Sequence, residues 1–203
     1  MKAEENSNII PDQQTGKAID AESSIELKDK TEAHVFFVEV KERLQHVNGW
    51  KEYAGNLSAS FQVVGNSGVE VQRKVKKGDY LKIDIPGPGS KSGKGFDWVR
   101  IEDVESFLGP DSERFGFRVR PTNNPQSNQL DTAHFYSQQS TSSFIVDRHG
   151  TKVTVSVHDR NTKPNTDADQ DIDKIRDVVV GTAGTLSFSK IQWKKLTDGL
   201  LKK

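Results

Sequence analysis

Cysteine is missing from this chain of 203 residues, which excludes disulfides, a thiolate nucleophile and zinc sites built on cysteine. Apolar runs long enough to cross a bilayer are missing as well. Neither sign of charge is in excess, because 29 Lys and Arg residues balance 29 Asp and Glu residues. A balanced charge favours neither nucleic acid nor an acidic membrane surface as a partner. The residues from Met1 to Glu5 are acidic and include no apolar stretch, so no secretory signal is expected and the cytosol is the predicted compartment.

Apolar residues are also scarce before residue 25. Residues 1–24 are polar and acidic, and such a stretch buries too little surface to offset the entropy lost on ordering. We therefore predict a flexible tail over residues 1–24 and one domain over residues 25–203. A docking role for the short motif Ile9-Ile10-Pro11 is the alternative to a plain tail.

A helix is predicted after the tail. Asp29 and Glu32 have the spacing of a capping box, and the apolar positions that follow repeat with a helical period. The apolar positions are Ala33, Phe36 or Phe37, Val40, Leu44 and Val47. Asn48-Gly49 supplies a helix stop.

From residue 57 to residue 158 the apolar period changes to two, which predicts strands. Seven candidate strands follow from this period: Leu57–Val64, Val69–Lys76, Tyr80–Ile85, Phe96–Val104, Phe115–Arg120, Phe135–Val146 and Lys152–His158. A weak additional strand, Ser24–Leu27, precedes the first helix. Alternation of this kind is typical of an antiparallel sheet with one covered face.

The C-terminal region is predicted to be helical. Trp193, Leu196 and Leu200 share one helix face, in a helix expected to begin near Ser187 or Ser189. Gly181 and Gly184 are expected to break the helical region before it. The fold class is thus α+β: a curved antiparallel sheet of about seven strands, with an N-terminal helix and C-terminal helices.

This order of elements resembles the START-like helix-grip superfamily, over most of residues 25–203. The resemblance is one of topology and rests on no diagnostic motif. It implies a curved sheet that wraps a long C-terminal helix around a cavity for apolar or amphipathic ligands. A closed or split β-barrel with flanking helices is the competing architecture.

The glycine-rich loop within residues 78–104 has some features of a phosphate-binding loop. A P-loop requires glycine where this chain has Pro88, and Ser or Thr where it has Gly95. A strand rather than a helix follows, so no helix N-terminus faces the loop. Nucleotide binding by this mechanism is excluded, and a mobile loop is expected, with an anion site on Lys91 and Lys94 as the alternative.

Catalytic and metal motifs are weak. The acidic run Asp167-x-Asp169-x-Asp171 has Ile172 where a calcium loop needs glycine, and the five histidines form no metal-binding pair. We therefore expect no metal and no cofactor. His134 and His158 lie near predicted strand ends, and a hydrolase that uses both is an alternative function.

Long polar loops are predicted to gather at one end of the sheet, because alternate connections of an up-and-down sheet share an end. Binding sites commonly lie on such loops. The candidate ligand or partner rim consists of Lys91, Lys94, Trp98, Arg120, His134, Arg160 and Asn161. Trp98 falls on the strand face opposite Val99, so it is either covered or exposed for binding.

The leading functional hypothesis is a non-enzymatic protein that binds a small apolar or amphipathic molecule between sheet and C-terminal helix. The first alternative is a protein–protein interaction or assembly subunit that uses the loop rim and the N-terminal tail. The hydrolase with His134 and His158 is the third hypothesis. Neither nucleic acid nor a membrane is expected as a partner.

Overall fold

The computed structural model describes residues 8–55, 59–85, 90, 92–128, 130–165 and 182–203, and of residues 182–188 the backbone alone. The strands are β1 (Lys17–Glu26), β2 (Ser60–Val64), β3 (Tyr80–Asp84), β4 (Asp97–Leu108), β5 (Ser112–Pro121), β6 (Thr141–His149) and β7 (Lys152–Thr162). The helices are α1 (Lys30–Gln45), α2 (Trp50–Ala54) and α4 (Thr182–Leu200), with a 3₁₀ turn at Val47–Gly49.

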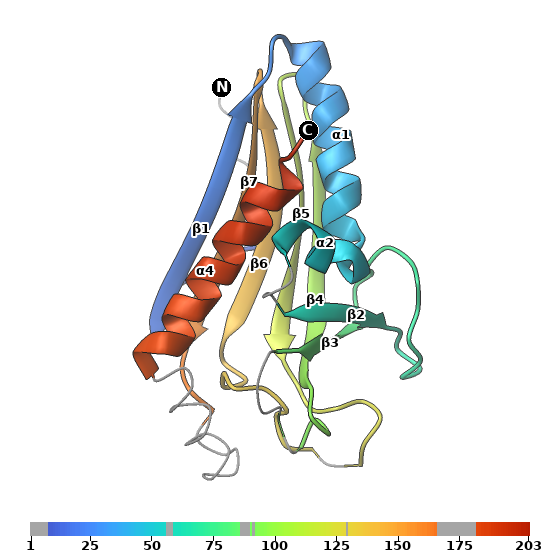
Figure 1. The fold of residues 1–203 in the computed structure, drawn as a ribbon, viewed down its shortest axis with the longest axis vertical. Helices are drawn as coiled ribbons and strands as arrows, with labels where there is room; N and C mark the ends of the chain where they lie inside the picture. The colour runs from blue at the N-terminus through green and yellow to red at the C-terminus, as the bar shows by residue number, and fades with distance from the viewer. Residues whose placement is uncertain (1–7, 56–58, 86–89, 91, 129, 166–181) are drawn as a thin grey trace.

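The seven strands form one open antiparallel sheet in the order β1-β7-β6-β5-β4-β3-β2. All three helices lie on the same side of this sheet (Figure 1). The predicted α+β class is confirmed, and the barrel alternative is wrong because β1 and β2 stand at opposite edges of the sheet. The order of elements and the position of α4 over the sheet agree with the helix-grip resemblance.

Helix α1 begins where the capping box predicts. The Asp29 carboxylate accepts a hydrogen bond from the Glu32 backbone N–H at 2.9 Å, which satisfies one of the N–H groups at the helix start. Phe36, Phe37 and Val40 are buried against the sheet. A polar contact also joins α1 to the sheet, because Glu113 of β5 binds both Arg148 of β6 and His34 of α1. Burial acts to raise the pKa of Glu113, but its hydrogen bonds to His34 and Arg148 outweigh burial and hold it below its usual range.

Two expectations about the strands are wrong. Residues 69–76 form no strand beyond an isolated bridge between Glu70 and Val64. Backbone hydrogen bonds join Val69 to Gly65 and Val71 to Val63, and side chains supply further bonds to this stretch. The amide of Asn48 donates to the Val71 carbonyl at 2.9 Å, and that of Gln62 donates to the same carbonyl at 3.1 Å. The seventh strand is β1, which begins at Lys17. Residues 17–24, expected in the flexible tail, therefore lie in the sheet, paired with β7.

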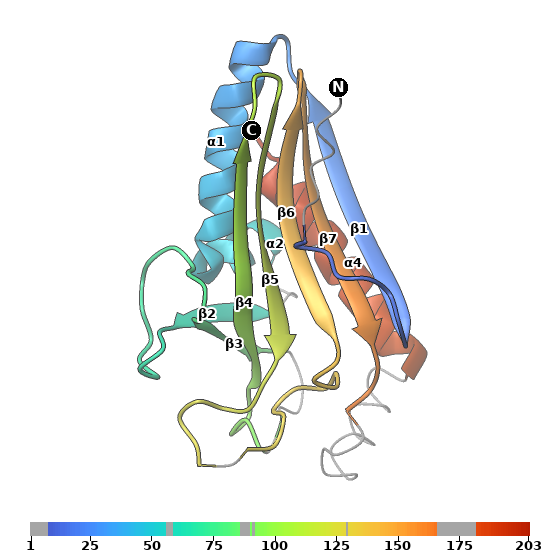
Figure 2. The same ribbon diagram turned by 180° about the vertical axis from the view of Figure 1, so that it is seen from behind.

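Residues 8–16 cross the outer face of the sheet, on the side away from the helices (Figure 2). Ile9 is fully buried there, and its carbonyl accepts a hydrogen bond from the Ser143 hydroxyl at 2.6 Å. Further along, the Asn161 side chain accepts from the backbone N–H groups of Gln14 and Thr15. We call residues 8–16 the N-terminal strap.

Helix α4 runs unbroken from Thr182 through Gly184, so the predicted break at Gly184 is wrong. Gly181 and the acidic run at residues 167–171 lie outside the described residues. Trp193, Leu196 and Leu200 are buried, as predicted, while Lys190, Lys194 and Lys195 are exposed. No helix within the described parts of the chain is long and apolar enough to span a membrane.

Aromatic side chains fill most of the space between the sheet and the helices. The Trp50 ring lies 4.9 Å from Phe144 and 5.2 Å from Phe61, measured between centroids. Phe144 in turn meets Trp193 of α4 edge-on at 5.2 Å. Such contacts add to the stability gained from burial alone. The packed part of the core therefore ends at Trp193, and a cleft begins beyond it.

Candidate functional site

The cleft lies between α4 and the end of the sheet that carries the long loops. Its described lining comes from five strands or their ends, the loop after β5, and α4: Phe61, Leu81, Ile83, Ile85, Val99, Val119, His134, Phe135, Tyr136, Ser142, Phe144, Ser189, Gln192 and Trp193. Most of these side chains are apolar or aromatic, as is usual for sites that bind small organic molecules. The cleft is partly open to solvent.

The cleft is small in this conformation, with a cavity volume of about 40 Å³. A single water needs on the order of 10–15 Å³ on this scale, so the cavity holds only a few water-sized groups. An organic molecule larger than that has to widen the cleft or extend through its open side.

Side-chain hydrogen bonds join helix α4 to the rest of the molecule both toward its C-terminal end and beside the cleft. Toward its C-terminal end, Thr197 and Asp198 bind the Ser23 hydroxyl of β1 at 2.7 Å and 2.6 Å. Near the cleft, the described polar contacts of α4 include two hydrogen bonds to residues outside the helix. One joins Ser189 to Tyr136, and the other joins Trp193 to Asp159.

Hydrogen-bonding groups of the cleft lie close to one another around Tyr136. The Tyr136 hydroxyl lies 3.2 Å from the Ser189 hydroxyl, which is long for a bond between two hydroxyls. Burial raises the pKa of Tyr136 above its usual value, so the phenol stays protonated. His134 Nδ1 accepts the backbone N–H of Tyr136 at 2.9 Å, which places the proton of a neutral imidazole on Nε2.

Asp159 of β7 lies behind Trp193 and is 1% exposed. Its Oδ2 accepts a hydrogen bond from the Trp193 indole N–H at 2.9 Å. Burial raises the pKa of Asp159 to about 6, and hydrogen bonding from Ser142 and Trp193 opposes the rise. A buried carboxyl that titrates near neutral pH thus stands one side chain away from the cleft.

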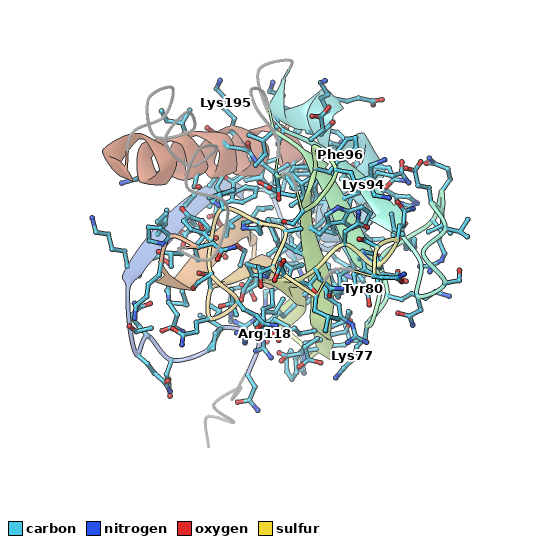
Figure 3. All side chains as sticks on the ribbon, turned by 90° about the horizontal axis from the view of Figure 1, so that it is seen from below. Lys77, Tyr80, Lys94, Phe96, Arg118 and Lys195 are labelled. Carbon is cyan, nitrogen blue, oxygen red and sulfur yellow. The ribbon has the colours of Figure 1, made fainter. Side chains whose placement is uncertain are left out.

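The predicted rim residues fall into different surroundings. His134 lines the cleft. Trp98 is 1% exposed and packs with Val64 and Ala133, so it is covered rather than presented for binding. Lys94 is exposed on the loop before β4, close to Phe96 in the view from the loop end (Figure 3). Lys91 lies outside the described residues.

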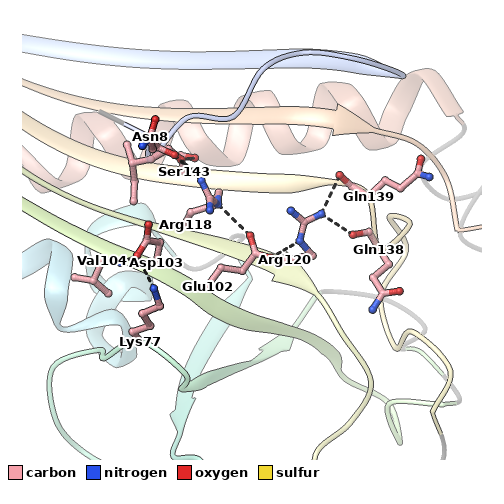
Figure 4. A network of polar contacts seen from close by, with 11 residues as sticks. Asn8, Lys77, Glu102, Asp103, Val104, Arg118, Arg120, Gln138, Gln139 and Ser143 are labelled. Atoms are coloured by element: carbon pink, nitrogen blue, oxygen red, sulfur yellow. Dashed lines mark hydrogen bonds and ion pairs between the residues drawn. The ribbon is translucent and has the colours of Figure 1, made fainter. Parts of the chain in front are cut away.

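Arg120, Arg160 and Asn161 lie away from the cleft, on the outer side of the sheet. Arg120 donates to Glu102 and to the backbone carbonyls of Gln138 and Gln139. Glu102 also binds Arg118 at 3.0 Å, and Arg118 holds the carbonyl of Asn8 in the N-terminal strap (Figure 4). These side chains are therefore engaged in holding the loops and the strap.

Arg160 and Asn161 serve the same outer side at the end of β7. Arg160 pairs with Asp20 of β1 at 2.8 Å, and Asn161 binds the strap. The sequence placed these residues on one rim with His134. Two of the predicted loops touch, because the Gln126 amide donates to the Gly68 carbonyl at 2.8 Å, but the side chains of the predicted rim point to different faces of the sheet.

The two histidines of the hydrolase hypothesis do not meet. Val157 belongs to the core under the helices, so its neighbour His158 points to the outer face, whereas His134 lines the cleft. His158 instead lies between Asp20, at 2.6 Å from Nδ1, and Ser156, at 3.0 Å from Nε2. Burial acts to raise the pKa of Asp20, but its hydrogen bonds to His158 and Arg160 hold it below its usual value.

This order of Ser156, His158 and Asp20 is that of a hydrolytic triad, but its surroundings oppose catalysis. Ser156 is 5% exposed, and its cross-strand neighbour on β1 is the acidic Glu22. A developing oxyanion would meet a negative charge there, and β7 is paired on both sides, which uses its backbone N–H groups. We assign the cluster to joining β1 to β7. Among the described residues, no group of three or more His, Asp or Glu side chains is placed to hold a metal ion.

Several side chains in or beside the cleft were left out of the candidate rim, among them Asp159, Ser189, Gln192 and Trp193. Trp193 was recognised as a core residue of the terminal helix, and the alternation of β7 places Asp159 on the same face as Val157. The sequence therefore indicated the buried face of α4 and that of β7. It did not indicate that α4 crosses β7, which brings Trp193 and Asp159 together.

No protein-family model matches the chain, and no curated protein matches its sequence significantly. The fold is similar to that of a hypothetical protein from Helicobacter pylori, with a TM-score of 0.53 and 12% identity over 94% of this chain and 90% of that chain. At this identity the likeness shows the fold alone.

Two further solved structures are more distant. Ara h 8.0201 has a TM-score of 0.33 and 13% identity over 89% of this chain and 99% of that chain. A truncated norcoclaurine synthase from Thalictrum flavum has a TM-score of 0.34 and 8% identity over 90% and 96% of the two chains. Both TM-scores are too low to support conclusions about this protein.

Proposed function

We propose that this protein binds a small amphipathic molecule in the cleft between the sheet and α4. The observation that carries the proposal is the lining of the cleft, which is mostly apolar and aromatic and includes the adjacent hydroxyls of Tyr136 and Ser189. The walls bind the apolar part of the molecule, and the hydroxyls of Tyr136 and Ser189 orient its polar part.

The position of α4 supports the same proposal. Its C-terminal half is joined to β1 through Ser23, while the half beside the cleft is joined through Ala59, Tyr136 and Asp159. An entering molecule that replaces the long bond between Tyr136 and Ser189 would let this half of α4 move outward. Widening of the small cavity then requires no change in the sheet.

The alternative of a protein–protein interaction or assembly subunit that uses the loop rim and the N-terminal tail receives less support at Trp98 of that rim. That hypothesis expects an exposed apolar patch at Trp98, yet the side chain is 1% exposed. The hydrolase alternative receives less support because His134 and His158 lie on different faces.

Native mass spectrometry of the purified full chain, before and after addition of octanol, tests the proposal. Ile85 lines the cleft and is half-buried, so Ile85→Trp should fill the cleft and weaken octanol binding by roughly tenfold or more. The matched control is Val35→Trp on the outer side of α1, where Val35 is 62% exposed; it should bind octanol normally. Absence of any bound molecule, or equal binding by both variants, would overturn the proposal.

A further inference from the structure

The charge of the side chains around the cleft narrows the class of molecule that it accepts. Lys, Arg, Asp and Glu are all absent from the described lining. The arginines near the C-terminal ends of β5 and β7, Arg120 and Arg160, are engaged on the outer side of the sheet. A carboxylate or phosphate that entered the cleft would find no described cation to pair with, and an unpaired charge in an apolar site is strongly unfavourable.

The polar groups of the cleft suit an uncharged partner. Each hydroxyl of the Tyr136–Ser189 pair can both donate and accept, and their separation of 3.2 Å marks a weak mutual bond. A hydroxyl or carbonyl oxygen of a ligand can exchange this one long bond for two shorter ones. The Gln192 carbonyl oxygen already accepts the backbone N–H of Ala59 at 3.2 Å, which leaves the amide end of that side chain as a donor.

The buried Asp159 is a second reason to expect that the cleft disfavours anions. Its carboxylate is fixed behind Trp193 by the indole hydrogen bond, and at neutral pH its negative charge repels an anion in the cleft. A cation in the cleft would be attracted to Asp159 less strongly than in a direct ion pair, because Trp193 separates the cleft from the carboxylate. The electrostatics thus oppose anions most and leave neutral molecules unaffected.

We propose that the molecule bound in the cleft is uncharged and carries a hydroxyl or carbonyl group that Tyr136 and Ser189 bind, and that the cleft discriminates against carboxylates of the same size. This inference rests on the proposed function, since it specifies the ligand of the same cleft. Long-chain alcohols, phenols and ketones belong to the accepted class, and fatty acids at neutral pH do not.

Titrations followed by proton–nitrogen NMR on the full chain test this with three molecules of equal chain length: octanol, octanoate and octylamine. The reporter is the indole N–H of Trp193, assigned with Trp193→Phe, because this group lines the cleft and binds Asp159. At pH about 7.5 we expect octanol to bind at least about tenfold more tightly than octanoate, with octylamine no tighter than octanol. Tyr136→Phe should weaken octanol binding several-fold by removing one of the two hydroxyls.

Two outcomes separate the inference from the function on which it rests. If octanoate binds as tightly as octanol, the inference is wrong while binding in the cleft stands. If none of the three molecules moves the Trp193 signal, both are wrong. An internal control is octanoic acid at a pH where it is protonated: the same chain without its charge should then approach the affinity of octanol.

Discussion

Asp159 is a buried carboxyl whose pKa departs from the ordinary value for aspartate. Its pKa lies at about 6 in the folded protein, against 3.8 for an unperturbed Asp. A carboxyl with a raised pKa in the folded state contributes most to stability below the unfolded pKa, and the contribution is lost as the pH rises through the folded value. Between pH about 4 and pH about 7, the loss amounts to about 3 kcal/mol.

Replacing Asp159 by asparagine should therefore stabilise the protein at neutral and alkaline pH. An asparagine oxygen still accepts the Trp193 indole N–H but carries no charge. At pH about 8, Asp159→Asn should raise the free energy of unfolding by up to about 3 kcal/mol, and at pH about 4 by little. Urea denaturation at both pH values measures the difference, with Asp84→Asn at an exposed position as control. An equal gain at both pH values would show that shape rather than charge is responsible.

For single residues, the sequence predicted which face of the sheet a side chain occupies better than it predicted which groups surround that side chain. The alternation along β7 put Val153, Val155 and Val157 in the core, and all three are fully buried. The same alternation puts Asp159 on the covered face with Val157 and His158 on the other face, but it does not show that Asp159 is buried deeply enough to change its pKa. That depends on Trp193, which comes 34 residues later and reaches Asp159 only because α4 crosses β7.

At the scale of elements, the close contact between α2 and α4 positions the wall of the cleft. Gly199 of α4 lies against Tyr53 of α2, and a Cβ at Gly199 would come within 2.1 Å of the Tyr53 carbonyl oxygen. A backbone atom cannot move aside as a flexible side chain can. The two helices therefore approach this closely only because residue 199 is glycine.

Gly199→Ala should consequently push α4 away from α2 and lower the free energy of unfolding by roughly 1–3 kcal/mol, the usual cost of overpacking. Gly49→Ala is the matched control, because a Cβ there meets nothing within 4 Å and the residue has a negative φ of −92°. Thermal denaturation of both variants measures the effect. Comparable melting temperatures for the two would mean that α4 is not held by this contact.

The elements themselves were predictable where they carry an amphipathic pattern. Helix α1, with its capping box, and the strands from β3 to β7 follow that pattern. Most of the edge strand β1 was not predicted. Only Ile19 and Ala21 of its residues are buried, so its sequence is as polar as that of a flexible tail. Residues 69–76 gave the opposite error, since extended chain bound by side chains shows the same alternation as a strand.

At the scale of the whole molecule, the sheet has two covered faces with different roles. The helices and the cleft occupy one face, and the N-terminal strap covers part of the other. Ile9 lies over Gly116 of β5, with its Cγ1 within 3.5 Å of where a Cβ would stand. The strap thus uses a gap left by a glycine in the sheet, and its polar contacts through Arg118, Ser143 and Asn161 fix its course.

The separation of the two faces predicts that stability and ligand binding can be changed independently. Ile9→Ala removes a fully buried side chain and should lower the free energy of unfolding by about 2 kcal/mol or more. The neighbouring Ile10, which is only partly buried, supplies the matched control Ile10→Ala, with a smaller loss. Octanol affinity should be the same in both variants at temperatures where they remain folded, because the cleft lies across the sheet from the strap. Urea denaturation and NMR titration of the two proteins provide both measurements. Equal losses of stability would show that Ile9 does not anchor the strap, and a lower octanol affinity in Ile9→Ala alone would show that the two faces are coupled through the sheet.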